Sequence, residues 1–257
     1  MDKDYLHATQ APQSFGETIG ALFSRYPKLF AHLLPIGILL GILLALTESL
    51  QAEGLQLLEL GEPPPASFFV AALVGMVGNA YFWTVALLRT DGALAGRDSQ
   101  GAFVRAWGRV LPLIVYLFIY VVVVTVGMLL LVIPGVFLAI LLGPGMMLVA
   151  LRGTGVLGAL RRSATLVWGS WWFSLGVLVI ASLIAMIPLL VAESFLANLR
   201  GPVDPSELLT LVALSAGGMI FALPLFVSMA YTLIEALEAR KHNALMERET
   251  IQRSNPR

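Results

Sequence analysis

One stretch of this sequence limits its fold more than any other: the 42 residues from Val110 to Leu151 carry no formal charge. A helix needs about 20 apolar residues to cross the hydrocarbon core of a bilayer. The stretch is therefore twice as long as one span, and it predicts two spans joined by a turn. Because proline and glycine favour turns, we place this turn at Ile133-Pro134-Gly135.

The rest of the chain is similarly apolar. Of its 257 residues, 58% are hydrophobic and 12% are charged, whereas soluble domains carry roughly 25% charged residues. Four more uncharged runs supply the remaining spans: Leu29–Thr47, Pro63–Leu88, Ser163–Ala192 and Leu208–Ile234. Barrel strands would show alternating polarity in segments of about ten residues. The sequence therefore predicts an all-α membrane protein with six transmembrane helices.

The basic residues predict how these helices are oriented, because Lys and Arg collect on the cytoplasmic side of a membrane. Of the 16 Lys and Arg residues, all except Arg200 fall before the first span, after the sixth, or in the second-to-third and fourth-to-fifth connections. Both termini are thus expected to be cytoplasmic. The predicted divisions are a cytoplasmic N-terminus with an amphipathic helix (1–28), a membrane domain (29–234) and a charged cytoplasmic tail (235–257).

Three segments on the basic side of the predicted spans are amphipathic. They are Ser14–Tyr26 (SFGETIGALFSRY), Gln100–Val110 (QGAFVRAWGRV) and Val156–Trp168 (VLGALRRSATLVW). Apolar residues on one helical face and arginines on another are typical of helices that lie in the membrane interface. Since each segment precedes a pair of spans, the arrangement predicts a threefold repeat. Chance recurrence is the alternative, because amphipathic entries are common in membrane proteins.

Three longer segments carry a family resemblance. In order and spacing, FFVAALVGMVGNAYFWTVALL, LLLVIPGVFLAILLGPGMMLV and GVLGALRRSATLVWGSWWFSLGVLV resemble the YciC-like bacterial inner-membrane proteins. They are also similar to the membrane region of some glycerophosphodiester phosphodiesterases. The resemblance runs from about Phe68 to Ser194 and implies a multi-pass protein of the bacterial inner membrane. It implies no enzymatic activity, since the sequence shows no phosphodiesterase catalytic domain.

No sequence pattern points to catalysis. The middle of every predicted span lacks Asp, Glu, Lys and Arg, and the chain has no cysteine and three histidines, at positions 7, 32 and 242. Such scarcity disfavours a His/Cys metal site and a serine–histidine nucleophile. We therefore expect a non-enzymatic protein without cofactor or metal. The formal net charge of zero gives no global field for nucleic acid.

Two features of the predicted spans would suit a transport path. Asn79 is a polar residue in the second span, and Gly143-Pro144-Gly145 interrupts the fourth. Proline removes an amide donor and clashes with the preceding turn, and a broken helix at mid-membrane exposes carbonyl groups to a substrate. We favour a structural role for both features. Asn79 would then bond to a neighbouring helix, and the tripeptide would kink its own helix.

The densest group of basic and aromatic side chains lies on the cytoplasmic side. Its members are Arg161, Arg162, Trp168, Trp171 and Trp172, and in the lipid hypothesis below Arg105 and Arg109 join Arg161, Arg162, Trp168 and Trp172. Tryptophan at this level is typical of the aromatic belt, while the sharper hypothesis is a site for anionic lipid headgroups. The resulting prediction is a non-enzymatic, lipid-interacting envelope scaffold whose partner is the lipid bilayer. The alternative is a small-solute or lipid transporter that uses the Gly143-Pro144-Gly145 break.

Overall fold

The structure is a computed structural model, which describes residues 14–95, 101–196 and 205–254. These residues form seven helices: α1 (Phe15–Glu59), α2 (Ala66–Ala95), α3 (Ala102–Leu130), α4 (Val132–Arg152), α5 (Val156–Val167), α6 (Trp171–Leu196) and α7 (Pro205–Ser254). All of them except α5 are long and apolar enough to cross a membrane. The predicted all-helical fold with six candidate spans is therefore confirmed.

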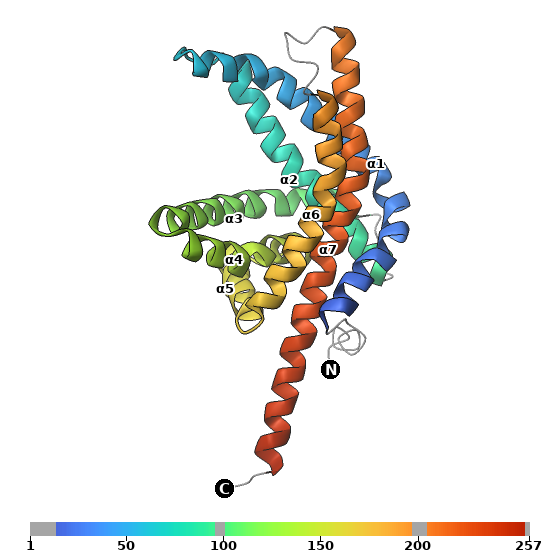
Figure 1. Cartoon of the computed structure of the whole chain (residues 1–257), viewed down its shortest axis with the longest axis vertical. Coiled ribbons are helices and arrows are strands. Elements are labelled where there is room, and N and C mark those ends of the chain that lie inside the picture. The colour runs from blue at the N-terminus through green and yellow to red at the C-terminus, as the bar shows by residue number, and fades with distance from the viewer. Residues whose placement is uncertain (1–13, 96–100, 197–204, 255–257) are drawn as a thin grey trace.

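The helices do not form a simple parallel bundle. In Figure 1, α6 and α7 run along the long axis of the molecule, and α1 packs against α7. The hairpin of α3 and α4 extends crosswise to one side, with α5 beside α4, and α2 runs diagonally between α1 and this hairpin. The candidate functional site lies between α2 and this crosswise hairpin.

The closest packing joins the first helix to the last. On α1, Leu29, Leu33, Ile36 and Leu40 recur every three or four residues and are completely or almost completely buried. Gly37 and Gly41 lie on the same side of α1, where a Cβ at Gly37 would be 3.1 Å from the Cα of Ile220 and one at Gly41 would overlap Ala216. Small residues at these positions let the two backbones approach.

Helix α1 includes the first of the three predicted amphipathic segments. It begins with a capping box, in which the Ser14 hydroxyl accepts from the Glu17 amide and the Glu17 carboxylate accepts from the Ser14 amide, each at 3.2 Å. From there it continues through Pro27 and Pro35 to Glu59. The predicted boundary at residue 28 therefore does not coincide with a helix end.

The second amphipathic segment is also continuous with its span, since α3 begins at Ala102. Only the third segment forms a helix of its own, α5, which buries Ala159, Ser163, Leu166 and Val167. Leu157 and Trp168, which belong to the predicted apolar stripe, are 69% and 66% exposed. The fifth span begins at Trp171 rather than Ser163, and the threefold repeat stays a prediction.

The end of the chain is also more helical than its charge suggests. The predicted last span, Leu208–Ile234, lies within α7, and this helix continues without interruption to Ser254. The predicted tail, 235–257, is thus helical as far as the structure describes it. The charged residues after Ile234 indicate where the apolar span ends, but they do not end the helix, because Glu, Lys and Arg are good helix formers.

The turn between α3 and α4 lies at Leu131, so its predicted position at Ile133-Pro134-Gly135 was wrong by two residues. Leu131 has an extended backbone (φ −161°, ψ 139°), and α4 begins at the next residue. Proline is tolerated in the first turn of a helix, where its missing amide would have no helical partner. Gly135 permits close contact of the two helices, since a Cβ there would lie 2.6 Å from the backbone nitrogen of Met128.

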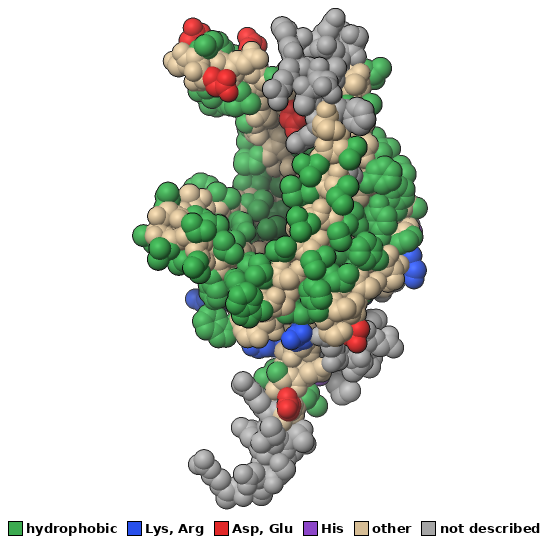
Figure 2. All heavy atoms as spheres, in the orientation of Figure 1, with side chains coloured by type: hydrophobic (Ala, Val, Ile, Leu, Met, Phe, Trp, Pro, Cys, Tyr) green, Lys and Arg blue, Asp and Glu red, His purple; other side chains and the backbone are tan. Residues whose placement is uncertain are grey.

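Charged side chains gather at opposite ends of the apolar body. Figure 2 shows the Lys and Arg side chains at its lower end, with some acidic ones among them, and acidic side chains alone at the upper tip, where α1 and α2 meet. Glu53, Glu59 and Glu62 are exposed near that tip. The α3–α4 tip differs, because its exposed side chains are all hydrophobic: Leu129, Leu130, Leu131, Val132 and Ile133 are 67–83% exposed. A continuous apolar surface of this kind is unusual in water.

Candidate functional site

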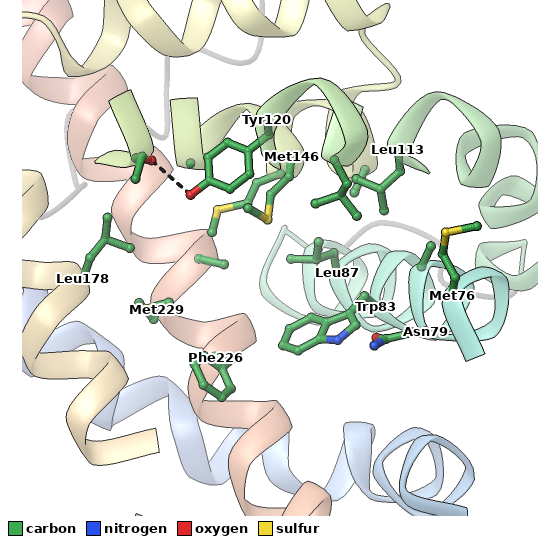
Figure 3. A pocket seen from close by; sticks show the side chains of 17 residues that line it. Met76, Asn79, Trp83, Leu87, Leu113, Tyr120, Met146, Leu178, Phe226 and Met229 are labelled. Carbon is green, nitrogen blue, oxygen red and sulfur yellow. Dashed lines mark hydrogen bonds between the residues drawn. The ribbon is translucent and has the colours of Figure 1, made fainter. Parts of the chain in front are cut away.

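A pocket of 470 Å³ lies between α2 and the α3–α4 hairpin, with α6 and α7 beside it (Figure 3). Ligand pockets have volumes of roughly 300–1,000 Å³. The described lining residues are Met76, Asn79, Ala80, Trp83, Leu87, Leu113, Leu117, Tyr120, Ala139, Gly143, Met146, Met147, Ala150, Leu178, Phe226, Met229 and Ala230. The pocket is partly open to the outside, and Figure 2 shows the surface hollowed between these helices.

Hydrocarbon and aromatic groups make up most of the lining. None of the seventeen described lining residues is Asp, Glu, Lys, Arg or His, and four are methionines. Methionine is flexible and adapts to differently shaped apolar ligands. Trp83 and Phe226 meet edge to face with ring centroids 5.9 Å apart, which gives the pocket a stiffer aromatic wall. The lining therefore favours an apolar ligand and provides no carboxylate, amine or imidazole for acid–base chemistry.

Asn79 is one of the few polar residues of the pocket. It lies one helical turn before Trp83 on α2, and Figure 3 shows both side chains at the same end of the pocket. The expected hydrogen bond from Asn79 to a neighbouring helix is not present among the described residues, where neither its amide nor the Trp83 indole N–H has a partner. The structure thus places Asn79 against a pocket rather than in a contact between helices.

Helix α4 passes through Gly143-Pro144-Gly145 without interruption. Proline cannot donate to the carbonyl of Ile140, and hydroxyl groups from α3 and α5 bond to the carbonyls around that point. Tyr120 donates to Ala139 at 3.4 Å, Ser163 to Leu141 at 2.8 Å and Tyr116 to Leu142 at 2.5 Å. Such side-chain hydroxyls are how a proline-containing helix is accommodated away from water.

The three residues of this tripeptide have different surroundings. Gly143 lines the pocket, and a Cβ added there would meet nothing within 4 Å. Pro144 and Gly145 are buried and are not part of the lining, and a Cβ at Gly145 would overlap the hydroxyl of Tyr116. Of the residues predicted for a transport path, the structure therefore brings together Asn79 and Gly143, while Gly145 serves close packing.

The four arginines of the predicted cluster make different contacts in the structure. The Arg109 guanidinium donates to the carbonyl oxygen of Ala150 and, at 2.8 Å, to that of Leu151. These are carbonyls of the last turn of α4, which have no amide partner within the helix. The Nε of Arg105 donates to its own helix start, the Gly101 carbonyl, at 3.4 Å. Arg109 therefore joins α3 to the end of α4.

Two further arginines meet on α7. Glu238 accepts from Arg162 at 2.8 Å and from Arg152 at 3.1 Å, which links α5 and the end of α4 to the last helix. Arg161, the neighbour of Arg162, is exposed and has no partner among the described residues. Of the four predicted lipid-binding arginines, Arg161 is the one to which the described residues supply no partner.

The tryptophans of this region form a second, aromatic group. Trp171 stacks on Phe137 of α4 with centroids 5.7 Å apart and meets Trp172 edge to face at 4.6 Å. Trp168 lies edge to face with the same Phe137 at 6.2 Å. Because Trp168 and Trp172 are 66% and 78% exposed, they present broad apolar surfaces beside the start of α6, as residues of an aromatic belt do.

Several residues that complete the pocket and the arginine cluster were not predicted from the sequence. Glu238 lies three residues after Glu235, which pairs with Arg25 at 2.7 Å, and this acidic pair on the basic side could have indicated ion pairs. Tyr116 and the pocket methionines gave no such indication, because in the sequence they resemble side chains that face lipid. Comparison of the chain with protein-family models, curated proteins and solved structures finds no significant match.

Proposed function

We propose that this chain is a multi-pass protein of the bacterial inner membrane with both termini in the cytoplasm. Six helices have suitable length and apolarity, and the basic side chains gathered at one end of the body are typical of a cytoplasmic face (Figure 2). In this topology α5 and the first turns of α1 and α3 lie at the cytoplasmic interface. Membership of the YciC-like family belongs to the same proposal and is supported by the sequence resemblance.

The proposed role is non-enzymatic: the protein is a lipid-interacting scaffold whose pocket receives the hydrocarbon chain of a membrane lipid. The observation that carries this proposal is a 470 Å³ pocket between apolar helices, with no charged residue among its described lining. A lipid chain that enters it moves from one hydrocarbon environment to another. Its binding therefore depends on van der Waals fit rather than on the hydrophobic effect.

Gly143 offers a direct test of lipid entry. Because Gly143 lines the pocket and nothing lies within 4 Å of a Cβ at this position, Gly143→Leu should fill part of the pocket, and Gly143→Ala is the matched control. The probe is bromine-labelled phosphatidylcholine in nanodiscs, which quenches nearby indoles. A chain that retains Trp83 as its sole tryptophan reports on the pocket, and one that retains exposed Trp172 reports on the surrounding bilayer.

We expect Gly143→Leu to reduce the quenching of Trp83 at least twofold, while Gly143→Ala leaves it near the wild-type value. Quenching of Trp172 should be the same in all three chains. Trp83 quenching that is unchanged by Gly143→Leu would overturn the proposal, because lipid would then reach Trp83 without using the pocket.

A second contact with lipid is proposed at the cytoplasmic edge. Exposed Arg161 and the exposed rings of Trp168 and Trp172 have the chemistry that an anionic headgroup and the adjoining interface require. Arg105, which is also exposed, adds positive charge on α3. Arg109 and Arg162 contribute less to this contact, since protein groups already bind them.

A small-solute or lipid transporter is the alternative function. It is favoured by one observation, that Asn79 and Gly143 line the same partly open pocket. Transport would require a second opening on the other side of the membrane. Uptake of a fluorescent lipid analogue into the inner leaflet of proteoliposomes, abolished by Gly143→Leu, would support the transporter over the scaffold.

A further inference from the structure

Two hydrogen-bonding groups stand side by side in the otherwise apolar pocket. Asn79 and Trp83 are four residues apart on α2, so their side chains lie on the same face, and both line the pocket (Figure 3). The Asn79 amide has two donors and one acceptor, and the Trp83 indole has one donor. Neither group has a hydrogen-bond partner among the described residues. The pocket therefore has a polar end.

A polar group without a partner is costly in a medium that cannot form hydrogen bonds. The rest of the lining relieves little of this cost, because Tyr120 already donates its hydroxyl proton to Ala139 and the side chains around it are apolar. A ligand that carries an oxygen atom to this end of the pocket would accept hydrogen bonds from the Asn79 amide and the Trp83 indole N–H. The same ligand would gain contacts from its apolar part along the rest of the lining.

The charge of the lining restricts the kind of ligand. No Lys, Arg or His is found among the described lining residues, so a phosphate or carboxylate would enter without a counter-ion, at a large desolvation cost. An uncharged ester, carbonyl or hydroxyl oxygen has no such penalty. The polar end of the pocket thus suits a lipid with a neutral head, such as a diacylglycerol, rather than a phospholipid head.

Together these observations lead us to infer that the pocket is a site for a neutral lipid, whose uncharged oxygen is hydrogen-bonded by Asn79 and Trp83. Its hydrocarbon chain lies between Leu117, Met146 and Phe226, which face the same space. This assignment rests on the proposed function, because it specifies the head of a ligand whose chain the pocket is proposed to receive.

The test uses full-length protein with Trp83 as its sole tryptophan, in nanodiscs of unlabelled phosphatidylcholine. Bromine-labelled diacylglycerol is added at increasing low mole fractions, and bromine-labelled phosphatidylcholine is added at the same fractions in a parallel series. The variant is Asn79→Leu, which keeps the side-chain size similar and removes both hydrogen-bonding functions. The control is Ser182→Leu, a polar-to-apolar change on α6 at a residue outside the described lining.

We expect diacylglycerol to quench Trp83 with saturation, and Asn79→Leu to raise the half-saturating mole fraction about tenfold, as the loss of a buried hydrogen bond to the ligand predicts. Ser182→Leu should leave the curve unchanged. Equal quenching by both lipids, insensitive to Asn79→Leu, would overturn the neutral-head assignment but leave the lipid-chain pocket in place. If neither lipid quenches Trp83, both the neutral-head assignment and the lipid-chain pocket are overturned.

Misfolding of the Asn79 variant is separated from loss of binding by two measurements. Its helix content, from circular dichroism, and its quenching by bromine-labelled phosphatidylcholine should match those of the Ser182→Leu control. Asn79→Gln, which keeps the amide, should restore at least half of the lost affinity for diacylglycerol. If Asn79→Gln binds diacylglycerol as poorly as Asn79→Leu, the amide is not the ligand-binding group.

Discussion

Tyr116 of α3 stands directly over Gly145 of α4, in the space that a side chain at position 145 would occupy. The tyrosine ring is completely buried, and its hydroxyl reaches past the glycine to donate to the carbonyl of Leu142 at 2.5 Å. This contact joins the two helices of the crosswise hairpin beside Pro144. It also gives the two glycines around this proline different tolerance to substitution.

Replacing Gly145 with alanine should destabilise the protein. The added methyl group would overlap the Tyr116 hydroxyl, and overpacking of this kind costs about 1–3 kcal/mol. Gly143→Ala adds the same methyl group where nothing lies within 4 Å, so it should be neutral or stabilising by up to about 1 kcal/mol, because alanine favours the helix. Reversible unfolding in mixed detergent micelles measures both values. Equal effects at the two positions would contradict the observed packing.

Gly41 should be equally sensitive, for a different contact. A Cβ at Gly41 would overlap the backbone of Ala216, which cannot move without shifting α7. Gly41→Ala should therefore lower the free energy of unfolding by about 1–3 kcal/mol. Gly20, on the same helix, has nothing within 4 Å, so Gly20→Ala serves as the control. A stable Gly41→Ala protein with unchanged unfolding would show that α1 and α7 are less closely packed.

Much of this fold could be predicted from the sequence, because hydrocarbon imposes simple demands on it. Uncharged length predicted the six spans, whereas the close α1–α7 contact is visible only in the structure. Helix ends were harder to predict, since no charge pattern requires a helix to stop at residue 28 or residue 234. The turn was misplaced for a related reason: Pro134 is as acceptable in the first turn of α4 as in a loop.

The arginines should separate into structural and lipid-contacting residues. Arg109→Gln removes a charged donor from the last carbonyls of α4 and should cost about 1.5–3 kcal/mol of stability. Arg161→Gln removes an exposed charge without a partner among the described residues, so stability should stay within about 0.5 kcal/mol while co-purified anionic lipid falls. Mass spectrometry of extracted lipid, paired with unfolding curves, measures both. Unchanged lipid in Arg161→Gln would remove this residue from the headgroup contact.

The α3–α4 tip should avoid water altogether. Leu129 to Ile133 present five consecutive apolar side chains that are 67–83% exposed, and apolar surface in water costs about 25 cal/mol per Å². The chain has no cysteine, so Leu130→Cys and Leu60→Cys can be labelled without background. A membrane-impermeant maleimide should modify Leu60→Cys, in the acidic α1–α2 turn, and spare Leu130→Cys. Similar labelling rates would mean that the tip emerges into water.

The candidate site was less predictable than the fold. Asn79 stood out because an amide is rare in a span, and Gly143 because it adjoins Pro144. Trp83, Met146 and Phe226 resemble any lipid-facing side chain in a linear sequence, and only the crosswise direction of α3 and α4 brings them around one space (Figures 1 and 3). Which arginines form ion pairs within the protein could not be predicted either, because it depends on where Glu238 contacts α4 and α5.

The pairing of α1 with α7 has a consequence for biogenesis. Among the six long helices α1 is the earliest in chain order, yet Gly37 and Gly41 make room for α7, which follows the other five. Until α7 has been made, this side of α1 lacks the backbone that it contacts in the finished fold. The α1–α7 pairing can therefore form only after Pro205–Ser254 has been made, so the contact between the first and last of these helices is among the final steps of assembly.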